Sequence, residues 1–207
     1  MAAKVDGRHS DTKERLFMIA LDLFSEHGVE GTSIRDIVNK AGVSTAAFYN
    51  HFSSKDALLQ AVYDYSQAAS RPEGDGELAE LLASLGPIDF IMRNMELFRK
   101  AMKDPVLSKL GRIIATEKGR NPIAAEISHK DCQRLIESSE TLFEGIQGLG
   151  YMKGRDARLI GRMFGYMQLG LFDENAYLRY VKKWSVDRIL ERQKAQMKAF
   201  LEEFIGG

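Results

Sequence analysis

The side chains best suited to reading a nucleic acid lie together in the stretch from Ala41 to Leu59, AGVSTAAFYNHFSSKDALL. An asparagine amide can form paired hydrogen bonds with adenine, and a threonine methyl group can contact thymine. Tyrosine and lysine side chains can reach the phosphates on either side. Thr45, Asn50 and their neighbours supply these groups, so their types indicate contact with duplex DNA if one element presents them together.

Two short predicted helices joined by Ala-Gly-Val-Ser are that element, a helix-turn-helix. Ser33 and Asp36 form the expected capping box of the first helix, Gly42 ends it, and Ser44 caps the second. Residues one turn apart share a helix face, so the second helix is expected to bury two side chains and expose four. The buried pair is Ala47 and Phe48, and the exposed set is Thr45, Ala46, Tyr49 and Asn50.

The predicted DNA contacts follow from this geometry. Tyr49, Lys55 and the helix-start Ser33 are expected at phosphates that flank the exposed face. Arg35 is expected at a phosphate or a base, and His51 either contacts a phosphate or packs at the helix end. The full predicted set is Ser33, Arg35, Ser44, Thr45, Ala46, Tyr49, Asn50, His51 and Lys55.

The overall charge gives this interpretation no support, because 29 basic residues balance 29 acidic residues. Any DNA-binding role must therefore rest on local charge. Within residues 31–55, Arg35, Lys40 and Lys55 stand against the single acid Asp36, so the local balance is positive.

The run from Gly31 to Leu59 resembles the DNA-binding signature of the TetR family of bacterial transcription regulators. It has Thr-Ser before the first helix, Ala-Gly-Val-Ser at the turn, Tyr-Asn-His-Phe at the end of the second helix, and Ser-Lys-Asp after it. It departs from the family pattern at Ala46, where Gly is common, and at Ala47, where Thr is common. The resemblance covers about residues 28–59.

The resemblance implies an all-α chain with a three-helix head and a larger C-terminal helical domain. We expect a DNA-binding domain over residues 1–55 and an effector-binding and dimerisation domain over residues 56–207. The implied function is that of a ligand-responsive homodimer, a repressor that leaves double-stranded operator DNA when a small, apolar effector binds. Its two recognition helices would lie about 34–36 Å apart, one turn of DNA.

The apolar periodicity of the chain predicts about nine helices and no strand. Residues 1–10 are expected to form a loose arm, and residues 71–77 a Pro/Gly/acid loop. The last two helices are expected at about 156–172 and 185–205. Expected helix starts include the capping boxes Asp11–Glu14 and Ser53–Asp56 and the first-turn prolines Pro87, Pro105 and Pro122.

Apolar stripes on the later helices predict where an effector and a second copy bind. Their methionines favour an adaptable pocket for an apolar or aromatic ligand, with ordinary core as the alternative interpretation. The predicted pocket residues are Phe90, Met95, Phe98, Met102, Phe143, Met163, Phe164 and Met167. The predicted dimer seam comprises Gly161, Gly165, Leu171, Ile189, Met197 and Phe204, with the two glycines permitting close helix approach.

Neither a cofactor nor a metal site is expected. Glu126-x-x-His129 is a single pair, whereas an iron-binding bundle needs two such pairs and two further glutamates. The single cysteine, Cys132, excludes an internal disulfide and favours a reducing compartment, and it is either a thiol sensor or inert. The absence of a secretory leader and of a membrane-length apolar run predicts a cytoplasmic protein without membrane attachment.

Two other classes of protein stay open at the level of sequence. A helical-bundle carrier or enzyme would need a catalytic constellation, and the sequence has no Gly-rich phosphate loop, paired metal motif or nucleophile elbow. An interaction protein with a relic helix-turn-helix fits the neutral net charge, but it does not explain the local excess of positive charge.

Overall fold

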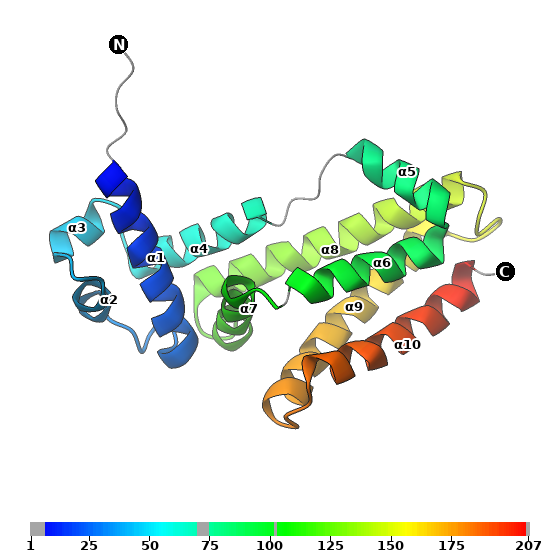
Figure 1. The fold of residues 1–207 in the computed structure, drawn as a ribbon. Helices are drawn as coiled ribbons and strands as arrows, with labels where there is room; N and C mark the ends of the chain where they lie inside the picture. Colours follow the sequence, from blue (N-terminus) through cyan, green and yellow to red (C-terminus); the bar gives the residue numbers. More distant parts are fainter. Residues whose placement is uncertain (1–6, 70–74, 102, 206–207) are drawn as a thin grey trace, which may run out of the picture. The chain divides into compact units, whose positions relative to one another are not determined.

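The computed structural model describes residues 7–69, 75–101 and 103–205, without the side chains of 7–11, 65–69, 75–79, 98–101, 176 and 180. Within these ranges the chain forms ten helices and no strand, which confirms the all-α prediction (Figure 1). The helices are α1 (Gly7–His27), α2 (Ile34–Ala41), α3 (Thr45–Tyr49), α4 (Lys55–Ala69), α5 (Asp75–Leu85), α6 (Pro87–Ala101), α7 (Pro105–Glu117), α8 (Pro122–Gly148), α9 (Ala157–Tyr180) and α10 (Val186–Ile205).

Most helix starts lie where the caps predict them. The Ser33 hydroxyl accepts a hydrogen bond from the Asp36 amide, and the Asp36 carboxylate accepts one from the Ser33 amide. Asp104 and Asn121 cap the helices that begin at the following prolines, and the Ser185 hydroxyl accepts from the Arg188 amide, three residues along. Local sequence therefore suffices to place these starts, because each cap satisfies amides within its own first turn.

Four expectations are wrong in their boundaries. Helix α1 begins at Gly7, so Asp11 lies inside the helix and does not cap it, and residues 7–10 are helical. The expected arm over residues 1–6 lies outside the described residues.

The other three differences concern later helices. Ser54, and not Ser53, accepts from the Ala57 amide at the start of α4. Helix α5 begins inside the predicted loop 71–77 and accounts for the tenth helix, and α9 continues to Tyr180 instead of ending near residue 172. An acidic residue in a first turn is favourable whether or not a cap precedes it, so the acidic pattern alone does not fix the start.

The chain divides into two compact units by its internal contacts. Residues up to 71 and residues 103–129 form the first unit, and residues 72–102 and 130–207 form the second. Helix α7 therefore packs with the N-terminal helices, although the sequence assigns it to the C-terminal part. The functional boundary at residue 55 is a separate matter and stays a prediction.

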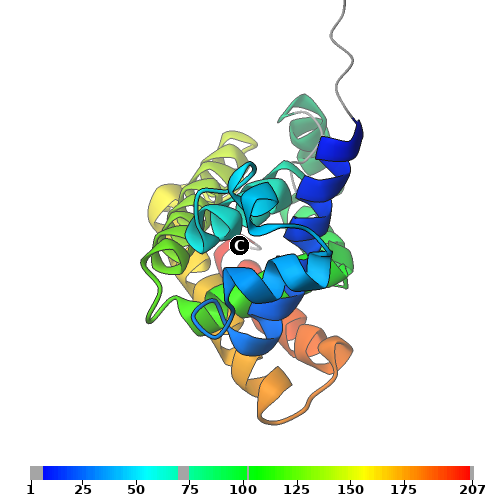
Figure 2. The same cartoon turned by 90° about the vertical axis from the view of Figure 1, so that its left-hand side faces the viewer.

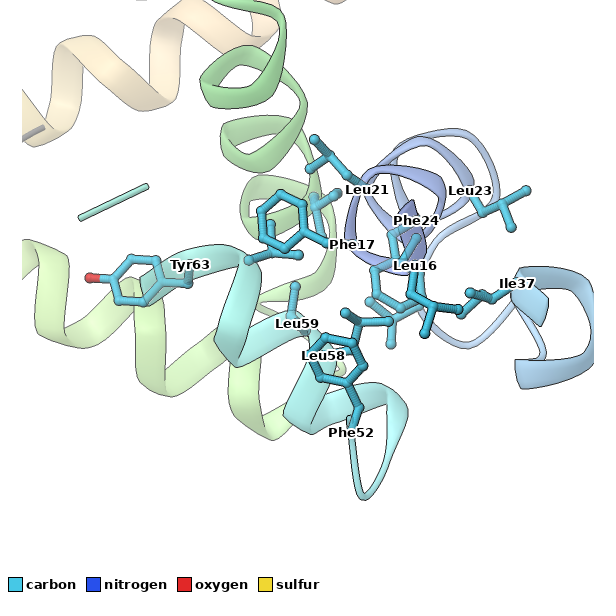
Figure 3. Packing of buried hydrophobic residues seen from close by; sticks show 14 of the residues in the cluster. Leu16, Phe17, Leu21, Leu23, Phe24, Ile37, Phe52, Leu58, Leu59 and Tyr63 are labelled. Atoms are coloured by element: carbon cyan, nitrogen blue, oxygen red, sulfur yellow. The ribbon is translucent and has the colours of Figure 1, made fainter. Parts of the chain in front are cut away.

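Helix α1 is the centre of the first unit, where it packs against α2, α4 and α7. Its buried residues Leu16 and Phe24 meet Ile37 of α2 and Leu58 of α4 in one hydrophobic cluster (Figure 3). Phe48, the single fully buried residue among the five of α3, completes this cluster. Burial of about ten large apolar side chains in this way gives the short helices α2 and α3 a stability that they lack alone.

The second unit is built on contacts of α10 with α6 and α9. A series of ring contacts runs through its core, with centroids of Phe143 and Phe164 5.2 Å apart, Phe164 and Phe200 5.6 Å apart, and Phe200 and Phe204 4.6 Å apart. Among the described helices, none combines the length and the apolar character that a bilayer crossing requires.

Candidate nucleic-acid interface

A tight turn at Gly42 sets the angle between α2 and α3. Gly42 has φ +65°, and its amide donates to the carbonyl oxygens of Val38 and Asn39. An added Cβ would meet nothing within 4 Å, so the backbone conformation, and not space, requires glycine here. Ser44 then caps α3 by accepting from the Ala47 amide at 3.1 Å.

The four residues of α3 and its C-cap that are predicted to face outward are exposed, and of the predicted buried pair Phe48 is buried and Ala47 half-buried. Phe48 is 0% exposed, and its ring centroid lies 5.9 Å from that of Phe52. Tyr49 is 54% exposed, and Thr45, Ala46 and Asn50 are exposed with it. Figure 2 views the chain from the side on which α2 and α3 lie in Figure 1. A half-buried helix with small residues at its start can approach base edges closely.

The residues that flank this face are held by local hydrogen bonds. The Ser33 hydroxyl donates to the Asp36 carboxylate at 2.6 Å, and this bond, with that from the Ser33 amide, lowers the pKa of Asp36. Arg35 is exposed, and His51 is half-buried with its ring centroid 6.3 Å from that of Phe52. Both capping serines are exposed residues, and their predicted DNA contacts stay predictions.

Lys55 has partners that the sequence does not predict. Its Nζ donates to the backbone oxygens of Val29 at 2.8 Å and Thr32 at 2.9 Å. Both acceptors belong to the loop between α1 and α2, 23 and 26 residues away in the chain. The predicted phosphate contact of Lys55 is not tested by this arrangement, but two of its three ammonium donors are already engaged.

Polar residues at the end of α7 and the start of α8 also contact the head helices. Asn121 Nδ2 donates to Asp56 Oδ1 at 3.0 Å. The fully buried Glu117 carboxylate accepts from Arg120, and a Cβ on Gly28 would lie 2.6 Å from Glu117 Oε1. Asn121 is recognisable from sequence only as a helix cap before proline, because its partner lies 65 residues away.

The predicted pocket residues differ in their burial. Phe90, Phe143 and Phe164 are buried within the apolar core of the second unit, and Met95 and Met167 pack partly buried against it. Met163 is 46% exposed whereas its neighbour Phe164 is buried, and the contact of either with an effector stays a prediction. The side chain of Phe98 and all of Met102 lie outside the described residues.

One open hollow in the described part of the second unit lies elsewhere and has a volume of about 300 Å³. None of its lining residues belongs to the predicted pocket set. They come from the α5–α6 corner, the α8–α9 loop and the end of α10: Leu85, Gly86, Pro87, Ile88, Asp89, Tyr151 and Ile205.

The predicted dimer seam is mostly internal to the chain. A Cβ on Gly161 would lie 2.6 Å from the Ser139 carbonyl oxygen, and one on Gly165 would lie 3.1 Å from Ile136 Cα. The close approach that these glycines permit is therefore with α8 of the same chain. The remaining members are buried or half-buried in the chain's own core: Leu171, Ile189, Met197 and Phe204.

Charged residues reinforce the contact between α8 and α9. The buried Glu140 carboxylate accepts hydrogen bonds from Arg158 Nε at 2.9 Å and Arg162 Nε at 2.5 Å. The bond from Arg162 is the largest influence, and with Arg158 it lowers the pKa of Glu140 although burial acts in the opposite direction. In the described part of the chain, no three His, Cys, Asp or Glu side chains gather as a metal site would require, and His129 is exposed.

The geometry of α2 and α3 defines a helix-turn-helix, and comparison with known proteins shows what this segment is similar to. Residues 19–62 match the model of "Bacterial regulatory proteins, tetR family". The regulator AcrR of Shigella flexneri is 35% identical over 68 residues, which are 33% of this chain and 32% of AcrR. An HTH-type transcriptional repressor of Mycobacterium tuberculosis is 31% identical over 112 residues, which are 54% of each chain.

The fold beyond the head is also shared. The solved SmeT–triclosan complex superposes with a TM-score of 0.69 at 20% identity, covering 94% of this chain and 92% of SmeT. The family match is thus confined to residues 19–62, and at 20% identity the SmeT structure shows a shared fold. The sequence matches span only about a third to a half of the length of these two curated relatives.

Proposed function

We propose that the protein is a homodimeric transcriptional repressor that binds operator DNA through α3 and is released by a small apolar effector. The observation that carries this proposal is the division of α3 into a buried Phe48 and an exposed face of Thr45, Ala46, Tyr49 and Asn50. An exposed helix face of this kind, rigidly anchored from behind, has the shape and chemistry of a major-groove reader.

The roles of the exposed residues follow from their groups. Asn50 and Thr45 read bases, Ala46 allows the backbone to approach, and Tyr49 contacts a phosphate. Ser33, Ser44, Arg35 and His51 contact the strands on either side. In this proposal the protein acts in the cytoplasm, where operator DNA lies, and it is not an enzyme.

The partner surface that we propose is the outer face of α9. Leu159, Met163 and Tyr166 recur at helical spacing, and each is more than two-fifths exposed. Apolar side chains in such a row lose contact with water when a second copy covers them. This set replaces the internal residues that the sequence analysis predicts for the dimer seam.

An effector would act by linkage. If it binds more tightly to the arrangement of the two heads that DNA does not fit, it must weaken DNA binding. The half-buried Met95 and Met167 suit an apolar molecule, and the solved SmeT structure holds triclosan. Triclosan is therefore the first probe to titrate, with loss of duplex binding as the expected result and native mass spectrometry of the purified protein as a search for a retained ligand.

The DNA-binding role is tested by selecting duplexes from a random pool with the wild-type protein and measuring binding at two salt concentrations. Binding should fall steeply with salt. Tyr49→Phe should weaken binding to every duplex, and Asn50→Ala should relax the preference at one base pair by about 1–3 kcal/mol.

Gln133→Ala is the matched control, because Gln133 is exposed on α8 in the second unit. It should bind like the wild type. If Tyr49→Phe and Asn50→Ala also bind like the wild type, α3 is not the reading element.

A further inference from the structure

Lys55 and Asp56, the first two residues of α4, face two different neighbours. Lys55 bonds the loop between α1 and α2, and Asp56 bonds the start of α8 through Asn121. Adjacent residues at a helix start share one rigid turn. A displacement of the α1–α2 loop is therefore transmitted through α4 to the start of α8, and the reverse also holds.

On the Lys55 side, the bonds hold the segment that precedes the helix-turn-helix. Val29 and Thr32 are buried, and the Thr32 hydroxyl donates to the Gly28 carbonyl oxygen at 2.9 Å. Ser33, the N-cap of α2, follows immediately. The position of this loop therefore fixes where α2 begins and, through the Gly42 turn, where α3 lies.

On the Asp56 side, one amide group serves two helices. Asn121 is 3% exposed, and its Oδ1 accepts from the Ala124 amide in the first turn of α8 at 2.9 Å. Its Nδ2 donates to Asp56, so the two ends of one amide hold the starts of both helices. Leaving this buried donor unpaired would cost the full desolvation of the group, so α8 and α4 move together at this point.

Glu117 gives the same corner a second contact with the head. Its carboxylate is fully buried, and Arg120 binds both of its oxygens. It lies so close to Gly28 that an added Cβ there would come within 2.6 Å of it. The end of α7 thus lies against the residue that follows α1, and the residue before α8 bonds the start of α4.

Resting on the DNA-binding function proposed above, we propose that Lys55 and Asp56 form a positioning pair that couples the start of α8 to the placement of α2 and α3. In this proposal Lys55 acts on DNA affinity through the loop and not as a phosphate contact. A change that shifts the first turn of α8 shifts the head by the same route, which is how an effector site could bias DNA binding.

The first test is Lys55→Met, which keeps the apolar stem and removes the ammonium group. Binding of a duplex selected by the wild type is measured over a series of salt concentrations. Affinity should fall about tenfold with the slope of log affinity against log salt unchanged. A slope reduced by about 0.9 means a lost phosphate contact and overturns the proposal, as does unchanged affinity.

The second test uses Asn121→Ser, which keeps a good capping oxygen for α8 and removes the amide that reaches Asp56. Asp56→Asn is the matched control, because it keeps an acceptor for Asn121. We expect amides 33–37 of the free protein to exchange hydrogen faster in Lys55→Met and Asn121→Ser, and at the wild-type rate in Asp56→Asn.

The same variants measured on DNA complete the test. Asn121→Ser should weaken duplex binding severalfold, and the double variant with Lys55→Met should lose less affinity than the product of the two single effects. The proposal is overturned if the affinity loss of the double variant equals the product of the two single losses. It is also overturned if amides 33–37 of Asn121→Ser exchange hydrogen at the wild-type rate. If the wild type selects no duplex, the proposed function fails, and the exchange measurement still decides whether the coupling exists.

Discussion

Replacing Gly161 with alanine tests the closest approach of two helices in the second unit. The new Cβ would lie 2.6 Å from the Ser139 carbonyl oxygen and 2.8 Å from Glu140 Cα. Both are backbone atoms and cannot rotate away. The carbon–carbon distance is about 0.7 Å short of the ~3.5 Å that such atoms prefer, so α8 and α9 must separate.

The size of the effect follows from two opposing terms. Alanine in a helix is more favourable than glycine by about 0.5–1 kcal/mol. Overpacking a tight contact costs about 1–3 kcal/mol, and separation also lengthens the bonds from Arg158 and Arg162 to Glu140. The free energy of unfolding of Gly161→Ala should therefore fall by about 0.5–2 kcal/mol.

Gly145→Ala supplies the matched control, because Gly145 is exposed in α8 and an added Cβ meets nothing within 4 Å. The free energy of unfolding of Gly145→Ala should rise by about 0.5–1 kcal/mol. The assay is urea unfolding followed by circular dichroism, with all chains at one concentration because association changes apparent stability. Equal stabilisation by both substitutions would refute the close approach of α8 and α9.

Three further predictions concern the head and the charged contact of α9. Phe48→Ala should lower the free energy of unfolding of the first unit by about 3–5 kcal/mol and abolish duplex binding, as measured by urea unfolding and by fluorescence anisotropy. Gly42→Ala should lower the free energy of unfolding by about 1–2 kcal/mol, because alanine is unfavourable in its left-handed backbone conformation. Gly28→Ala should lower it further, because the new Cβ also meets the buried Glu117 carboxylate of α7. The pKa of Glu140 is lowered on folding. Its contribution to the free energy of unfolding is therefore complete above its ordinary pKa of 4.5, and it is lost as the pH falls through the lowered pKa. The difference in unfolding free energy between the wild type and Glu140→Gln should therefore shrink in acid, and a constant difference from pH 7 to pH 3 would contradict this reasoning.

The head was predictable from sequence because its determinants are local. The Ser33 box, the Gly42 turn and the Ser44 cap each act within four residues, and the inward direction of Phe48 follows from helical spacing. The family resemblance rests on these same residues, so it places the helix-turn-helix but says less about the second unit.

The remaining features depend on partners far away in the sequence. Helical spacing marks Gly161 as a point of close approach, but it cannot say whether the neighbour is α8 or a second chain. The interior bonds of Lys55 join residues 23 and 26 positions apart, and a lysine after a serine cap gives no sign of them. Met163 and Phe164 are adjacent in an apolar run, and only the packing of α9 decides which of them is buried.

The small size of α3 has a consequence for how this protein can evolve. Phe48 holds its five residues to the core, while Thr45, Ala46, Tyr49 and the C-cap residue Asn50 are exposed. In the function proposed above, exchanges at these four positions would alter the preferred operator sequence while leaving folding nearly untouched. Regulators descended from a common ancestor can thereby acquire new target genes through single substitutions, without compensating changes elsewhere.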